Sequence, residues 1–96
     1  MNVGVAQVSL RLPENLSLKG KRQVLRSIVS RVRNKFDVAI AEVDNNDDWR
    51  LMTLGISAVS NDRRFTNSVL SNVVEFIEKA RFEAEMLDYE IEIIDM

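Results

Sequence analysis

The chain alternates between segments with the two-residue hydrophobic period of strands and segments with the three- to four-residue period of helices. The order of these segments constrains the fold more than any other feature of the sequence. Over residues 3–12 apolar and polar side chains alternate with a period of two, which is typical of a strand with one buried face. Pro13 cannot donate a hydrogen bond to a sheet, so we expect the strand to end there. Residues 18–35 then place apolar side chains every three or four positions, and Ser17 is a suitable N-cap, so this segment predicts an amphipathic helix.

The same two periods recur in the second half of the chain. Residues 36–43 and 49–60 alternate with a period of two, and the Asp- and Asn-rich segment 44–48 between them is a turn by composition, which predicts a β-hairpin. A second amphipathic helix is predicted near residues 62–81, and a last strand around residues 88–93. The predicted order of elements is therefore βαββαβ.

This order predicts a ferredoxin-like α+β fold, in which two helices cover one face of a four-stranded antiparallel sheet. A chain of 96 residues fits one such domain, which we assign to residues 1–96. The small residues Gly4 and Ala6 in the first strand would allow a helix to approach the sheet closely. The predicted buried residues of the two helices are Leu18, Leu25, Ile28, Val29, Val32 and Phe36, and Phe65, Val69, Val73, Phe76, Ile77 and Ala80.

The absence of cysteine and histidine excludes the commonest catalytic and metal-binding groups. No thiol nucleophile, thiolate ligand or imidazole base is available. Asp44, Asn46 and Asp48 resemble the start of a calcium loop, but Trp49 and Gly55 stand where that loop requires glycine and glutamate. We therefore expect no catalytic residue, no metal site and no cofactor, and a protein that is not an enzyme. The last-placed alternative is an enzyme that uses carboxylates with a bound metal or small molecule, for which the sequence contains no identifying motif.

The first residues show neither a signal peptide nor a membrane span. The segment 1–12 has no basic start before an apolar run, and polar residues interrupt it. A cytoplasmic location without membrane association is the corresponding expectation.

The small net charge of −2 conceals a strong separation of charge along the chain. Residues 1–36 carry eight basic side chains against Glu14 alone, a net charge of +7, and the remaining residues carry a net charge of −9. Seven of the thirteen basic residues lie between positions 19 and 35, where there is no acidic residue. The first predicted helix is therefore a basic element in an acidic protein.

Four of these basic residues share one side of the predicted helix. At 100° per residue, they occupy a sector of about 60°, and they extend over about 21 Å of helix axis. Such a ridge could bind the phosphate backbone of RNA. The alternative is a solvated face whose charges aid solubility or pair with acidic residues elsewhere. The predicted phosphate contacts are the four residues of this ridge, Lys19, Arg22, Arg26 and Arg33, together with Lys21 in the first turn of the helix.

The usual RNA-binding mode of this fold is not expected. An RNA-recognition motif stacks bases on aromatic side chains of its central strands, and residues 3–12 contain none. Trp49 stands at the very start of the third strand, where we expect it to be a core anchor rather than an exposed contact residue. Binding of RNA would therefore depend on the first helix and on loops.

The uncovered face of the sheet offers a second class of function. Val3, Val5 and Val59 would lie there without a helix to cover them. A modest apolar patch of this kind could join two copies of the chain. A protein-interaction or homo-oligomerisation domain is therefore the alternative to an RNA-binding module.

Several short segments together resemble the YlxP-like family of small bacterial proteins. They are residues 17–22 (SLKGKR), residues 41–44 (AEVD), Trp49 and residues 59–62 (VSND), and the resemblance extends over essentially the whole chain. The resemblance implies a ferredoxin-like fold. Because genes of this family often lie near those for translation initiation factor two and ribosome-binding factor A, it also implies a role connected with RNA or the ribosome.

Overall fold

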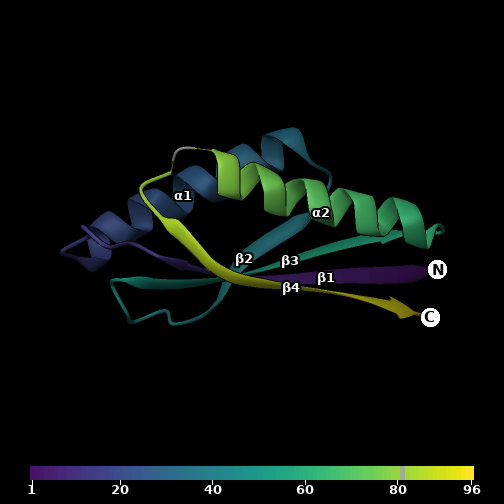
Figure 1. The fold of residues 1–96 in the computed structure, drawn as a ribbon, viewed down its shortest axis with the longest axis horizontal. Helices are drawn as coiled ribbons and strands as arrows, with labels where there is room; N and C mark the ends of the chain where they lie inside the picture. The colour runs from purple at the N-terminus through teal and green to yellow at the C-terminus, as the bar shows by residue number, and fades with distance from the viewer. Residues whose placement is uncertain (81) are drawn as a thin grey trace.

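The computed structural model describes residues 1–80 and 82–96, and it contains the predicted elements in the predicted order (Figure 1). The last position of the predicted second helix, residue 81, lies outside the described residues. The elements are β1 (Asn2–Arg11), α1 (Leu18–Lys35), β2 (Ala39–Asp44), β3 (Leu51–Ser60), α2 (Arg63–Lys79) and β4 (Glu85–Asp95).

The four strands form one antiparallel sheet in the order β2-β3-β1-β4. Both helices lie on the same side of this sheet, and the two ends of the chain lie close to each other at one end of the molecule (Figure 1). Helix α1 packs over the edge strand β2, and α2 packs over β1, β3 and β4. The ferredoxin-like α+β fold predicted from the sequence is thus confirmed. Neither helix within the described ranges is long and apolar enough to cross a membrane.

The core lies between the sheet and the helices. The even-numbered residues of β1 and β3 point into it, as their period of two predicted, because both central strands present one face to the helices. The fully buried side chains of this cluster include Val8, Leu12, Ile28, Val32, Met52, Leu54, Leu70 and Val73.

Helix α2 approaches the sheet most closely at Gly4. A Cβ atom on this residue would lie 2.5 Å from Cγ2 of Thr66 and 2.6 Å from Cδ1 of Leu70. The expectation that a small residue in β1 admits a close helix is therefore confirmed at this position.

The start of α2 shows that the predicted buried residues were in part wrong. Phe65 is 60% exposed, and Thr66, the next residue along the helix, is buried in its place. The Thr66 hydroxyl donates a hydrogen bond of 2.6 Å to Oδ1 of Asn2 and lies 2.6 Å from Oγ of Ser60. Because these bonds satisfy the buried hydroxyl, the helix presents threonine rather than phenylalanine to the sheet.

Candidate nucleic-acid interface

One side of α1 carries four exposed basic residues, Lys19, Arg22, Arg26 and Arg33, which we call the basic face. Among the residues that the structure describes, none of the four has a carboxylate oxygen within 4 Å of its charged nitrogen atoms. Arg33 donates a hydrogen bond of 3.3 Å to the carbonyl oxygen of Ile40, which places the C-terminal end of this face beside β2. The basic face thus forms no ion pair with the acidic residues that the structure describes.

The charges of α2 behave differently. Lys79 forms an ion pair with Glu75, one helical turn away, and the hydrogen bond between them lowers the pKa of Glu75 and raises the pKa of Lys79. Arg63 forms an ion pair of 2.6 Å with Asp95 at the end of β4. Arg63 and Lys79 of α2 therefore have acidic partners that the basic face lacks, whereas Arg64 forms no ion pair with the described residues.

The N-terminal end of α1 concentrates positive potential. Ser17 is the N-cap, as predicted, and its hydroxyl accepts a hydrogen bond of 3.0 Å from the backbone N–H of Gly20. The first turn contains no acidic residue, although acidic side chains are the ones that stabilise a helix at this end. Lys19 and Arg22 instead add positive charge to the positive end of the helix dipole, a combination that attracts anions.

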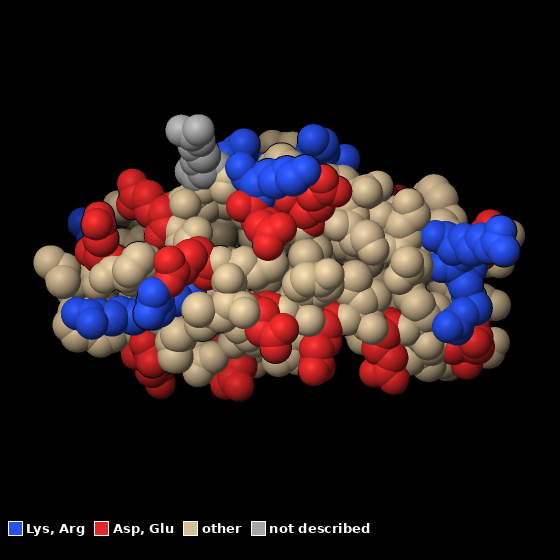
Figure 2. Space-filling model, viewed as in Figure 1, with Lys and Arg blue, Asp and Glu red and all other residues tan. Residues whose placement is uncertain are grey.

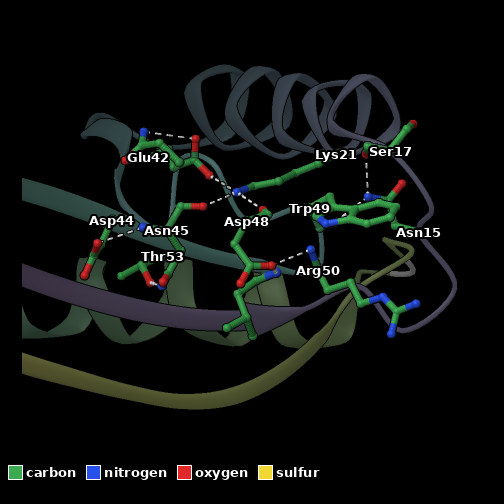
Figure 3. A network of polar contacts seen from close by, with 12 residues as sticks. Asn15, Ser17, Lys21, Glu42, Asp44, Asn45, Asp48, Trp49, Arg50 and Thr53 are labelled. Carbon is green, nitrogen blue, oxygen red and sulfur yellow. Dashed lines mark hydrogen bonds and ion pairs between the residues drawn. The ribbon is translucent and has the colours of Figure 1, made fainter.

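Lys21 is not part of the basic face, so its prediction as a phosphate contact was wrong. Only 2% of its surface is exposed. Two helical turns separate it from the buried Ile28, so both side chains point to the same side of α1, toward the core. Its ammonium group lies 2.8 Å from Oε2 of Glu42 in β2 and donates hydrogen bonds to the carbonyl oxygens of Asn45 and Asp48 in the loop between β2 and β3 (Figure 3).

Hydrogen bonds to Lys21 and within the loop give residues 45–50 a defined conformation. Asn45 adopts a left-handed backbone conformation with φ of 61°, and its side chain donates a hydrogen bond of 2.7 Å to Oγ1 of Thr53. The carboxylate of Asp48 accepts hydrogen bonds from the backbone N–H groups of Arg50 at 2.8 Å and Leu51 at 3.1 Å. Two carbonyl oxygens of the turn point to the ammonium of Lys21, which supplies the positive charge at the centre of this loop (Figure 3).

Trp49 lies exposed on this loop, so the expectation of a core anchor was wrong. The residue keeps 45% of its surface in solvent. The amide of Asn15 donates one hydrogen bond to the carbonyl oxygen of Trp49 and another, of 2.7 Å, to that of Ser17 (Figure 3). Trp49 is thus held next to the N-cap of α1. Its charged neighbours Asp48 and Arg50 are the signal in the sequence that favours a turn rather than a buried strand at this position.

The remaining basic residues of α1 face the other helix. The guanidinium of Arg31 lies 4.9 Å from the ring centre of Phe82 and 5.4 Å from that of Phe76. The ammonium of Lys35 lies 4.9 Å from the ring centre of Phe76. These cation–π contacts occupy both side chains in the junction between α1 and the C-terminal end of α2, away from the basic face.

The sheet face opposite the helices has two different parts. A shallow hollow crosses β2, β3 and β1 over the small residues Ala39, Ala41, Gly55 and Ser57, and its lining includes Arg33, Glu90 and Glu92. A row of acidic side chains borders the sheet beneath the helices, along the lower edge of the view in Figure 2 where β4 lies. This acidic border repels phosphate, so it leaves the basic face of α1 as the candidate nucleic-acid interface.

Comparisons with known proteins agree with the resemblance seen in the sequence. The family described as "Protein of unknown function (DUF503)" matches residues 3–91. The chain is 41% identical over 76 residues to "Uncharacterized protein YlxP" of Bacillus subtilis (strain 168), with 79% of this chain and 83% of that protein covered. It also resembles the solved structure of the de novo designed protein Foldit4 (TM-score 0.54, 13% identity, 100% of this chain and 99% of that chain covered), which concerns the fold alone. The chain belongs to the DUF503 family, whose members include YlxP.

Proposed function

We propose that this protein is a non-enzymatic RNA-binding module that holds the phosphate backbone on the basic face of α1. The observation that carries the proposal is the exposure of Lys19, Arg22, Arg26 and Arg33 on one side of a helix, with no carboxylate near enough to pair with them among the described residues. Charges kept free in this way are available to phosphate oxygens.

The spacing of the basic face suits an extended polyanion. Lys19 and Arg33 are fourteen residues apart, which corresponds to about 21 Å along the helix axis. This length covers several consecutive phosphates of a nucleic-acid strand, and the positive end of the helix dipole strengthens the attraction at Lys19. Contacts to phosphate carry no base information, so binding through this face would tolerate many sequences. RNA, and the ribosome in particular, is the proposed partner because genes of the family that the sequence resembles often lie near genes for translation factors.

The salt dependence of RNA binding tests this proposal. We expect log K to fall linearly with log salt, with a slope of about −3 if four phosphates of a single strand are neutralised. Arg22→Ala/Arg26→Ala should reduce this slope by about 1.4, because two phosphate contacts are lost. Fluorescence anisotropy of a labelled unstructured RNA, measured from about 50 to about 200 mM salt, gives both slopes.

A matched control separates the site from total charge. Arg63→Ala/Arg64→Ala also removes two positive charges, but from exposed positions at the start of α2, outside the basic face. We expect this variant to bind like the wild type. No binding by the wild type at low salt, or equal losses in the two double variants, would contradict the proposed interface.

A second candidate function is self-association through the open sheet face. Val59, Val3 and Ile94 form one cross-strand row on the side without helices, and Val59 and Ile94 are both exposed. We expect sedimentation velocity to show a concentration-dependent dimer that Val59→Asp abolishes, since the charge would be buried against the partner's apolar row. A monomer at every concentration would exclude this function.

A further inference from the structure

We propose that Trp49 is a stacking platform for an unpaired base of an RNA strand whose backbone lies on α1. This inference rests on the proposed function and extends it, because it specifies single-stranded RNA, or an unpaired end or loop, as the ligand. The basic face alone would accept a duplex equally well.

The exposure of Trp49 is unusual and is not the result of a loose loop. Tryptophan is normally largely buried, since its ring removes more apolar area from water than any other side chain. Here the residue is 45% exposed while hydrogen bonds fix the main chain on both sides of it. Lys21 binds the carbonyl oxygen of Asp48 at 2.6 Å, Asn15 binds that of Trp49, and the carbonyl oxygen of Arg50 accepts a hydrogen bond of 2.8 Å from the N–H of Leu12. The indole is therefore presented by a pre-organised loop.

The same contacts place the indole at the positive end of α1. Asn15 bridges the carbonyl oxygens of Trp49 and of the N-cap residue Ser17, and Lys21 ties the loop to the first turn of the helix (Figure 3). The basic face begins in that turn with Lys19. An RNA strand that lies along the basic face would reach Trp49 at the point where the RNA passes the N-terminal end of α1.

The charges around the ring favour a base over a phosphate. The guanidinium of Arg50 lies 5.9 Å from the ring centre, which leaves a cation beside an aromatic face, the combination found in binding sites for single strands. Asp47 on the same loop and Asp44 at the end of β2 are both exposed and would repel a phosphate. Phosphates would therefore stay on α1, and the flat, uncharged base would occupy the loop.

Trp49 also differs from the other exposed aromatic residues. Phe65 and Tyr89 are the other two in the described part of the chain, and neither has a cation over its ring there. Phe65 lies in the first turn of α2, and Tyr89 lies between the acidic residues Asp88 and Glu90 on β4. Phe65 thus provides a matched control of similar exposure outside the proposed interface.

Intrinsic fluorescence reports on this site alone, because Trp49 is the single tryptophan of the chain. We expect titration with a short unstructured RNA to quench the emission of the wild type and to saturate together with anisotropy of the labelled RNA. Trp49→Ala should weaken binding of this RNA about 5- to 100-fold, Trp49→Phe should weaken it less, and Phe65→Ala should leave it unchanged. Binding of a blunt duplex of the same length should be insensitive to Trp49→Ala, since it offers no unpaired base.

The possible failures are distinguishable. Salt-dependent binding that requires Arg22 and Arg26, combined with unchanged emission and normal affinity of Trp49→Ala, would overturn the stacking role and leave the proposed function standing. No RNA binding at low salt would remove both. Equal losses for single-stranded RNA and duplex in Trp49→Ala would also overturn the inference, because the ring would then support the loop rather than contact a base. The fluorescence measurement on the wild type does not depend on whether a variant folds.

Discussion

Replacing Lys21 by methionine is expected to lower the free energy of unfolding by about 3–5 kcal/mol, the usual cost of removing one partner of a buried ion pair. Methionine keeps the length and the apolar stem of the side chain but removes the ammonium. The carboxylate of Glu42 would lose the cation 2.8 Å from its Oε2 atom, and the carbonyl oxygens of Asn45 and Asp48 would lose their donor. Both partners are largely shielded, so water cannot replace these bonds without opening the loop. Urea denaturation followed by circular dichroism measures the loss.

Two further variants show whether the loss comes from the buried pair. Lys19→Met changes the same residue type two positions earlier, at an exposed site, and should alter the free energy of unfolding by less than about 0.5 kcal/mol. Lys21→Met/Glu42→Leu removes both charges and should recover part of the loss, since no uncompensated carboxylate remains. Equal stabilities for Lys21→Met and Lys19→Met would contradict the role of Lys21 in holding the loop.

Local patterns were sufficient to predict the fold. Each strand and helix has its own hydrophobic period, and the ferredoxin-like arrangement follows because two helices must cover one face of the sheet. Local patterns did not predict which of Phe65 and Thr66, at the start of α2, is buried against the sheet. Both positions fit a helical period, and the burial of threonine depends on the hydroxyl of Ser60, six residues earlier, and on the amide of Asn2 in β1, which is distant in the sequence. Long-range polar contacts of this kind leave no periodic signal.

The same distinction applies to the candidate site. Exposed basic residues on one side of α1 could be predicted because helical geometry alone sets their angles. Lys21 is buried only because Glu42 and two loop carbonyl oxygens, more than twenty residues later, compensate its charge. Trp49 is exposed because that loop turns away from the core around the same ammonium group. Both wrong predictions therefore have one cause, the non-local contact between α1 and the loop.

Gly4→Val is expected to destabilise the fold by about 3 kcal/mol, at the upper end of the usual cost of overpacking a core. Its Cβ atom would lie 2.5 Å from Cγ2 of Thr66 and 2.6 Å from Cδ1 of Leu70, on the face that α2 covers. Thr66 cannot move away easily, because its hydroxyl is hydrogen-bonded to Asn2 in the adjacent part of β1. The whole helix would have to rise from the sheet. Thermal or urea denaturation of the variant measures the effect.

Gly55→Ala is the control that separates helix packing from strand propensity. Gly55 lies in the neighbouring strand β3 but on the open face, where the three nearest atoms to an added Cβ atom all belong to the side chain of Val43, with Cγ1 at 2.7 Å. Val43 is 54% exposed on the edge strand β2, so its side chain can rotate away. Alanine also has less freedom to lose than glycine when the chain folds, and we expect a change in stability within about 1 kcal/mol of zero. If Gly4→Val were as mild as Gly55→Ala, α2 could not approach the sheet as closely as the contacts of Thr66 and Leu70 require.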